Sequence, residues 1–119
     1  MIAGPRSERV GAVFAALGDP TRRELLEKLS TSPTLSIRGL AADLPITRQG
    51  VAKHLGILEG AGLVEATRNG RESRYRLCTE PMSEATAWIV QIGAQWDARL
   101  SRLEQLLGGP VNEIGRAHV

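Results

Sequence analysis

The stretch Thr47–Val64, TRQGVAKHLGILEGAGLV, decides how the rest of the chain can be interpreted. Its apolar residues recur at helical spacing, yet Gly50, Gly56, Gly60 and Gly62 stand among them. A glycine inside a helix costs roughly 1 kcal/mol relative to alanine. We therefore expect that the missing side chains serve a purpose, such as close approach of another molecule or helix, or a backbone conformation that favours glycine.

A helix built from this stretch, at about 100° per residue, has two sides of different chemistry. The inward side carries Val51, Leu55 and Leu58. The outward side carries Arg48, Gln49, Ala52, Lys53 and Gly56. Hydrogen-bonding side chains separated by small residues suit a helix that enters the major groove of DNA. The free N–H groups at the start of the helix, with Thr47 beside them, suit a phosphate.

The glycines then have separate explanations. We expect Gly56 to clear the groove-facing side, and Gly50 to clear a crossing with the preceding helix. Gly62 fits a left-handed C-cap before Leu63. The sequence offers no explanation for Gly60. Taken alone, the pattern is equally compatible with a solvated helix face that carries Arg, Gln and Lys, because helix-turn-helix geometry has many false positives.

The residues before this stretch predict three further helices. Apolar spacing indicates a first helix over Ser7–Leu17, and Asp19 is expected to cap a second that starts at Pro20. A very short strand near Leu35 is followed by Ser36, a candidate cap for a short third helix. Thr47 then caps the fourth after a tight turn, and two short helices joined in this way form a helix-turn-helix. Arg22 and Arg23, at the start of the second helix, suit either phosphate contacts or ordinary ion pairs.

After Gly62 the apolar period changes from 3.6 to 2. The runs LVEATR and SRYRL flank NGRE, which is a strong hairpin signal. This hairpin carries four arginines: Arg68, Arg71, Arg74 and Arg76. An arginine at its tip suits the narrow minor groove, where the potential is most negative. The alternative is a charged edge hairpin that resists aggregation, but a basic hairpin directly after a helix-turn-helix favours nucleic-acid binding.

A long last helix is predicted from Pro81 to Leu107, before Gly108. Its apolar stripe contains Trp88, Ile89, Ile92, Trp96, Leu100, Leu103 and Leu107. The stripe is too apolar for one partner helix, so we interpret it as a dimer interface that pairs with the first helix. Residues 1–107 are expected to form one domain, and residues 108–119 a flexible tail.

The composition of the 119-residue chain limits the function classes further. With 42% hydrophobic residues but only two Trp, one Tyr and one Phe, the core is expected to be aliphatic and mainly helical. Cys78 is the only cysteine, which excludes an internal disulfide. There is no signal peptide or apolar run of transmembrane length, which predicts a cytoplasmic protein without a membrane partner. No catalytic constellation occurs at usable spacing, so we do not expect an enzyme.

Together these segments resemble the ArsR family of bacterial winged helix-turn-helix regulators. The resemblance covers roughly Val10–Leu107 and rests on LGDPTRRELLEKL, on LAADLPITRQGVAKHLGILEGAGLV, on the hairpin RNGRESRYRL and on the Trp-containing last helix. It implies a mainly α fold of five helices with a β-hairpin wing. It also implies a homodimer through the first and last helices, and a repressor that binds double-stranded DNA at an inverted-repeat operator until a signal releases it.

The metal-sensing part of the family pattern is missing. Where thiol-type relatives carry a Cys-x-Cys pair on the third helix, this chain has Ser36 and Arg38. Relatives with a site on the last helix use Asp, His and Glu, but no His occurs between Pro81 and Leu107. We therefore expect no metal site and no cofactor. Gly93 and Ala94 leave room near the tryptophans for a small-molecule effector of unknown chemistry.

These considerations give two sets of candidate residues. The DNA-binding set is Thr47, Arg48, Gln49, Lys53, His54, Arg68, Arg71 and Arg74. In it, Arg48, Gln49 and Lys53 are expected to read the major groove, Thr47 and His54 to hold phosphate, and Arg71 to probe the minor groove. The dimer set is Val10, Val13, Phe14, Leu17, Trp88, Ile92, Trp96, Leu100 and Leu103. The rival interpretations are a ligand-responsive regulator of the MarR type and a winged helix that binds proteins instead of DNA.

Overall fold

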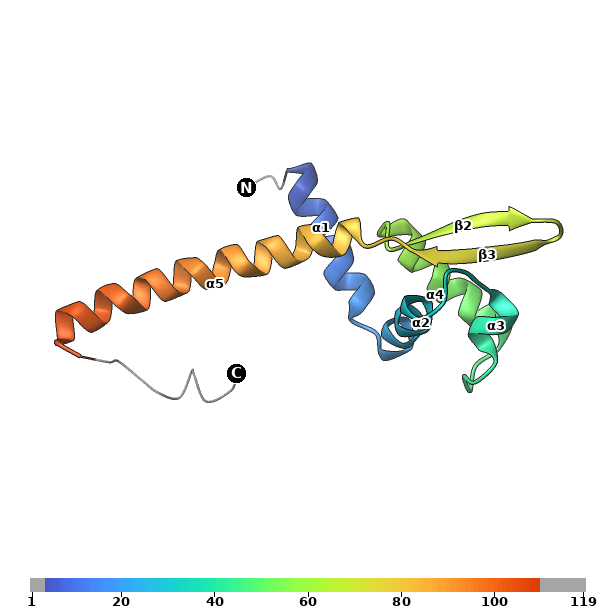
Figure 1. The fold of residues 1–119 in the computed structure, drawn as a ribbon, viewed down its shortest axis with the longest axis horizontal. Helices are drawn as coiled ribbons and strands as arrows, with labels where there is room; N and C mark the ends of the chain where they lie inside the picture. Colours follow the sequence, from blue (N-terminus) through green and yellow to red (C-terminus); the bar gives the residue numbers. More distant parts are fainter. Residues whose placement is uncertain (1–3, 110–119) are drawn as a thin grey trace. The chain divides into compact units, whose positions relative to one another are not determined.

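A computed structural model describes residues 4–109 of the chain (Figure 1). Contacts within the chain divide it into two compact units, Met1–Ala85 and Thr86–Val119, each described by itself below. The elements are α1 (Pro5–Leu17), α2 (Pro20–Ser30), β1 (Leu35–Ser36), α3 (Ile37–Ala41), α4 (Arg48–Gly60), β2 (Val64–Asn69), β3 (Glu72–Leu77) and α5 (Glu80–Leu107). Within the described residues, this order confirms the predicted winged helix-turn-helix with five helices and a hairpin.

The core of the first unit is aliphatic and is supplied by every helix of that unit. Its largest fully buried side chains are Leu25, Leu40, Leu55, Leu58, Leu63, Val13 and Val51. Burying one such side chain contributes about 1.5–3 kcal/mol, so this cluster holds the helices in place. The inward side predicted for α4 is confirmed, because Val51, Leu55 and Leu58 are each 0% exposed.

Local hydrogen bonds fix the two helices of the helix-turn-helix. The Ser36 hydroxyl accepts from the Gly39 N–H at 3.1 Å, and the Thr47 hydroxyl accepts from the Gly50 N–H at 3.0 Å. Both predicted caps are therefore confirmed. Asp19 also occupies the N-cap position, of α2, but its side chain makes no capping hydrogen bond. The predicted cap at Asp19 was correct in position and wrong in chemistry.

The C-terminal end of α4 forms a Schellman motif around Gly62. This glycine has φ of +77°, its N–H donates to the Glu59 carbonyl, and the Leu63 N–H donates to the Leu58 carbonyl. The left-handed C-cap is therefore confirmed. The explanation for Gly50 was wrong: a Cβ there would meet Thr47 and Ile46 at the start of its own helix, instead of the preceding helix.

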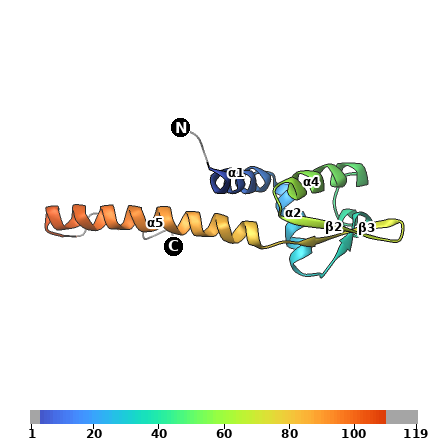
Figure 2. The same ribbon diagram turned by 90° about the horizontal axis from the view of Figure 1, so that it is seen from above.

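The sheet has three antiparallel strands in the order β1-β3-β2. Asn69 pairs with Glu72, so Gly70 and Arg71 form the two-residue turn, with φ of +68° at Gly70. Glycine at the first turn position matches a type II′ hairpin. The β2–β3 hairpin, residues 64–77, is called the wing below. Its tip extends past α3 and α4 (Figures 1 and 2). The predicted hairpin is confirmed, and Arg71 lies in the turn itself.

Most of α5 belongs to the second unit, and this part of the helix carries the predicted apolar stripe. Its large apolar side chains other than the partly buried Leu100 are exposed to between 41% and 83%, and Trp96 is 56% exposed. The Arg99 guanidinium lies 6.0 Å from the centroid of a Trp96 ring, within range of a cation–π contact. The helix ends at Leu107, before Gly108 with φ of +77°. The predicted flexible tail lies, from residue 110 on, outside the described residues.

Candidate nucleic-acid interface

Three elements of the first unit line one open groove of about 590 Å³, called the basic groove below. Its residues are Ser36, Ile37 and Arg38 around the start of α3, Arg48 and Gln49 in the first turn of α4, and Arg71, Glu72 and Ser73 from the wing. The groove therefore joins the start of the second helix of the helix-turn-helix to the hairpin tip. Three arginines against one carboxylate make it electropositive.

The three arginines of this groove have no partner within the described part of the chain. Arg38, Arg48 and Arg71 are exposed and make no hydrogen bond or ion pair to any other residue between 4 and 109. Most other arginines of the described part are engaged within the chain, for example Arg9 with Glu84 and Arg76 with Glu65. Unpaired guanidinium groups that converge on one groove attract a multiply charged anion such as a nucleic-acid backbone.

The remaining predicted DNA-binding residues divide into two groups. Lys53 is exposed one turn beyond Arg48 and Gln49 and has no partner in the described part of the chain. Thr47 is exposed, with its hydroxyl occupied by the cap. Arg68 is exposed on the wing, where its Nε donates to the Gly70 carbonyl at 3.3 Å. These three remain predictions, and their positions flank the basic groove.

Arg74 is partly buried and makes three contacts within the chain, which the sequence did not predict. Its Nε donates to the Thr34 hydroxyl at 2.9 Å and its Nη2 to the Thr34 carbonyl at 3.2 Å. Its Nη1 lies 3.2 Å from a carboxylate oxygen of Glu72. These contacts hold β3 to the segment before β1, and the DNA contact predicted for Arg74 stays a prediction.

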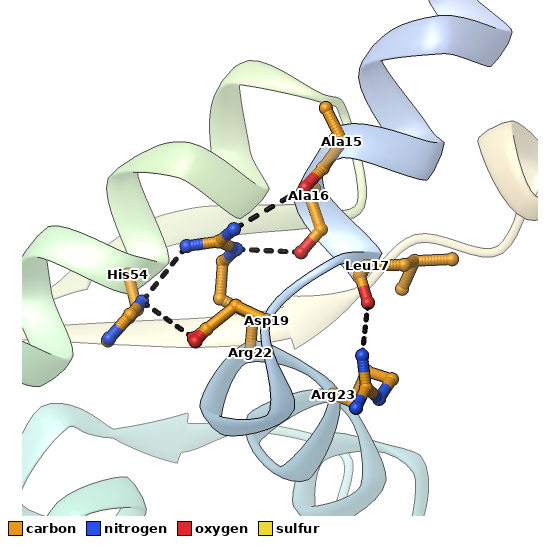
Figure 3. A network of polar contacts seen from close by, with 7 residues as sticks. All are labelled: Ala15, Ala16, Leu17, Asp19, Arg22, Arg23 and His54. Atoms are coloured by element: carbon orange, nitrogen blue, oxygen red, sulfur yellow. Dashed lines mark hydrogen bonds and ion pairs between the residues drawn. The ribbon is translucent and has the colours of Figure 1, made fainter.

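His54 is likewise engaged inside the protein (Figure 3). Its Nδ1 lies 3.2 Å from Nη1 of Arg22 and 3.9 Å from Oδ2 of Asp19. The Arg22 Nε also donates to the Ala16 carbonyl at 2.6 Å. This network joins the end of α1, the start of α2 and α4, and it occupies the Nδ1 of His54. The phosphate contact predicted for His54 stays a prediction.

The network also explains Asp19 and the two arginines of α2. Asp19 Oδ2 is buried and makes no hydrogen bond to any described residue, and the Nδ1 of His54 lies 3.9 Å from it. Arg23 donates to the Leu17 carbonyl at 2.6 Å. Both arginines therefore satisfy carbonyls at the C-terminal end of α1, which favours cations. The phosphate alternative for Arg22 and Arg23 finds no support in this geometry.

The predicted dimer residues do not all lie at a surface. Val10 and Val13 are 5% and 0% exposed and belong to the core of the first unit, so they have little area left for a partner. Leu17 is half-buried against the same core. Phe14 is 39% exposed, and Trp88, Ile92, Trp96 and Leu103 are 41–56% exposed on α5. Leu100 is partly buried.

The donor chemistry of α3 does not fit a metal. The Ser36 hydroxyl serves as a helix cap, and Arg38 carries a cation instead of a ligand. Within residues 4–109, no group of three or more His, Cys, Asp or Glu side chains is arranged to hold a metal ion. The same residues contain no helix long and apolar enough to cross a bilayer.

Comparison with known proteins agrees with this geometry. A family model described as a helix-turn-helix domain matches residues 17–67. The uncharacterized HTH-type transcriptional regulator YuzN of Bacillus subtilis is 42% identical over 85 residues, which span 66% of this chain and 92% of the relative. The transcriptional repressor SdpR of the same organism is 30% identical over 78 residues, 66% of this chain and 86% of the relative.

Among solved structures, an ArsR-like transcriptional regulator from Rhodococcus sp. RHA1 is similar to this chain with a TM-score of 0.75. The two are 41% identical, and the match covers 83% of this chain and 92% of that one. The Rhodococcus protein is named ArsR-like, which favours the ArsR family over the MarR-type alternative. The relatives are named transcriptional regulators, which argues against a winged helix without DNA binding. The chain belongs to the ArsR family of winged helix-turn-helix proteins and is a DNA-binding transcriptional regulator.

Proposed function

We propose that this regulator is a homodimeric repressor that binds an inverted-repeat operator through the basic groove and the outer face of α4. The observation that carries the proposal is the convergence of Arg38, Arg48 and Arg71, without partners in the described chain, on one groove beside the exposed Gln49. The relative SdpR is named a repressor, which supports repression over activation.

In this proposal the first turn of α4 enters the major groove. Arg48 and Gln49 are exposed at the N-terminal end of the helix, where side chains of a recognition helix reach base edges. A guanidinium pairs well with guanine, and a carboxamide pairs well with adenine. Lys53 follows one turn later on the same face. Arg71, in the two-residue turn of the wing, reaches the adjacent minor groove.

Dimerisation supplies the operator symmetry. The stripe of Trp88, Ile92, Trp96, Leu100 and Leu103 on α5 is apolar and largely exposed, and a second copy of the chain would cover it. Two-fold symmetry places two copies of α4 on half-sites about one helical turn apart, or a multiple of that distance, and therefore requires an inverted repeat. The dimer set is reduced to these α5 residues together with Phe14, because Val10 and Val13 are core residues.

The decisive experiment is fluorescence anisotropy of the purified protein on DNA from upstream of its own gene and on a scrambled duplex. The titrations are repeated over a series of salt concentrations. We expect a preference for the upstream duplex of about 10³ or more that persists at higher salt. Equal, weak binding to both duplexes would contradict operator binding at that site.

Adding zinc or cadmium, or a chelator, to the same titrations tests the proposed independence from metals. The donor set at Ser36 and Arg38 predicts no change in either affinity or specificity. Release of the DNA by one of these metals at micromolar concentration would contradict this part of the proposal.

The site of action we propose is the cytoplasm, where the operator DNA is accessible.

A further inference from the structure

The sequence predicted no DNA contact for Arg38, yet this residue lines the basic groove. It lies in the first turn of α3, is exposed, and has no hydrogen-bond or ion-pair partner in the described part of the chain. Arg6 interacts electrostatically with Glu84, and Arg99 contacts a Trp96 ring. The basic residues of the described part without any such partner are Arg38, Arg48, Lys53, Arg71 and Arg102. All of them except Arg102 lie on the α3–α4–wing face.

The sheet fixes the wall that carries Arg38 to the wing. Strand β1 ends at Ser36, directly before α3, and Ser36 pairs with Arg74 on β3. The Arg74 side chain adds two hydrogen bonds to Thr34, at 2.9 and 3.2 Å. Strand β1, which leads directly into α3, and the wing are therefore parts of one sheet. This pairing fixes the positions of Arg38 and Arg71 relative to each other on the groove.

Arg38 lies on α3, the helix before α4. It lines the basic groove but does not belong to α4, the helix that is proposed to enter the major groove of DNA. In a helix-turn-helix, the helix before the recognition helix crosses the sugar-phosphate backbone. A guanidinium at that place meets phosphate oxygens, which accept its paired N–H donors well. Glu72 is the only acidic residue on the groove, and it is already paired with Arg74. Arg38 is thus left without a competing carboxylate.

We propose that Arg38 binds a backbone phosphate of the DNA, so that α3 is a third contacting element beside α4 and the wing. Arg74 is the positioning residue that holds α3 and the wing together. The inference rests on the proposed DNA binding and adds a residue, its ligand chemistry and its support. The contact is independent of base sequence, so it acts on any duplex.

The test is the salt dependence of binding to a scrambled duplex, where phosphate contacts dominate. Removing one phosphate contact changes the slope of log K against log salt by about 0.9. We expect Arg38→Ala to reduce the slope by about 0.9 for each bound protomer, equally on the scrambled and the upstream duplex. Arg38→Lys retains the charge and is expected to keep the slope. Arg71→Ala is a positive comparison from the opposite wall of the groove.

Arg102→Ala is the matched control, because Arg102 is also exposed and unpartnered but lies on α5. Its slope is expected to equal that of the wild type. If Arg38→Ala has the same slope as Arg102→Ala, the proposal for Arg38 is overturned. The proposed function would remain intact in that case, because the wild type would still bind the DNA. Loss on the upstream duplex alone also overturns the proposal for Arg38, because Arg38 would then read a base. Absence of binding by the wild type would contradict the proposed function itself.

The positioning role of Arg74 needs a readout beyond stability. If Arg74 acts through Arg38, the slope change of the Arg74→Ala, Arg38→Ala double variant is expected to be smaller than the sum of the two single changes. Thr34→Val removes one acceptor of Arg74 with little change in size, and it is expected to shift the slope in the same direction by less. An additive slope change in the Arg74→Ala, Arg38→Ala double variant would show that Arg74 does not position Arg38.

Discussion

The Nη1 of Arg22 on α2 lies 3.2 Å from the Nδ1 of His54 on α4, and this contact ties the DNA-facing helix to the helix behind it. A guanidinium can only donate, so the Nδ1 of His54 is the acceptor in this contact. The same arginine donates to the carbonyls of Ala16 and Ala15. One partly buried side chain therefore satisfies the end of α1 and orients α4 (Figure 3).

Replacing Arg22 by Ala is expected to destabilise the fold by about 2 kcal/mol, because its hydrogen bonds to the Ala16 carbonyl, the Ala15 carbonyl and His54 Nδ1 are all removed. The measurement is urea unfolding followed by circular dichroism. The matched control is Arg23→Ala, which removes one hydrogen bond from an exposed side chain and is expected to cost under about 1 kcal/mol. Equal destabilisation of the two variants would show that the His54 network is not a stabilising unit.

Gln49→Ala is expected to relax base preference with little effect on nonspecific binding. Gln49 is exposed in the first turn of α4 and lines the basic groove. A bidentate hydrogen-bonded contact between a side chain and a base discriminates against the wrong base by about 1–3 kcal/mol. Anisotropy titrations on the upstream and scrambled duplexes should therefore converge, chiefly through weaker binding to the upstream duplex. A parallel decrease on both duplexes would remove Gln49 from the bases and assign it to the backbone.

The ion pair between α1 and the start of α5 predicts a pH dependence of stability. Arg9 Nε lies 3.0 Å from Glu84 Oε1, and its Nη2 lies 2.7 Å from Oε2. The hydrogen bonds and positive charge of Arg9 hold the pKa of the Glu84 carboxyl below its ordinary value of 4.5. Since the folded pKa is lowered, the pair contributes its full stability above pH 4.5 and loses it as the pH falls through the folded pKa.

Thermal unfolding of the wild type and Glu84→Gln from pH 7 to pH 3 measures this contribution. The wild type is expected to be the more stable at neutral pH, and the difference between the two should shrink below about pH 4.5. Other carboxylates titrate in both proteins, so only the difference is informative. Because both side chains are solvated, raised salt should also reduce it. A difference independent of pH would exclude the ion pair as its cause.

Local chemistry made much of the fold predictable. The caps at Ser36 and Thr47, the turn at Gly70 and the C-cap at Gly62 each depend on residues within a few positions of one another. The buried side of α4 followed from helical periodicity alone. These signals fixed the positions of Arg48, Gln49 and Arg71, which the structure brings to one groove.

What the sequence did not reveal depends on contacts between distant segments. Arg74 meets Thr34 across 40 positions, and His54 meets Arg22 across 32, so neither engagement has a local signature. Val10 and Val13 have the same helical spacing whether the partner is the core or a second subunit. Arg38 left one usable signal, a basic residue two positions after the cap of α3, but its place on the groove required the pairing of β1 with β3.

The apolar stripe on α5 predicts a dimer that one charge can disrupt. Leu103 is 41% exposed on this stripe, so Leu103→Glu would place a carboxylate in an apolar contact with the second copy. Light scattering after size exclusion is expected to give about twice the chain mass of 12.8 kDa for the wild type and the single-chain mass for the variant. Ser101→Glu adds the same charge two residues away, off the stripe, and is expected to remain dimeric.

A monomeric Leu103→Glu protein should also have a lower affinity for the inverted repeat, because each half-site would then be bound separately. If both variants remained dimeric, the subunits would associate through a surface other than the stripe.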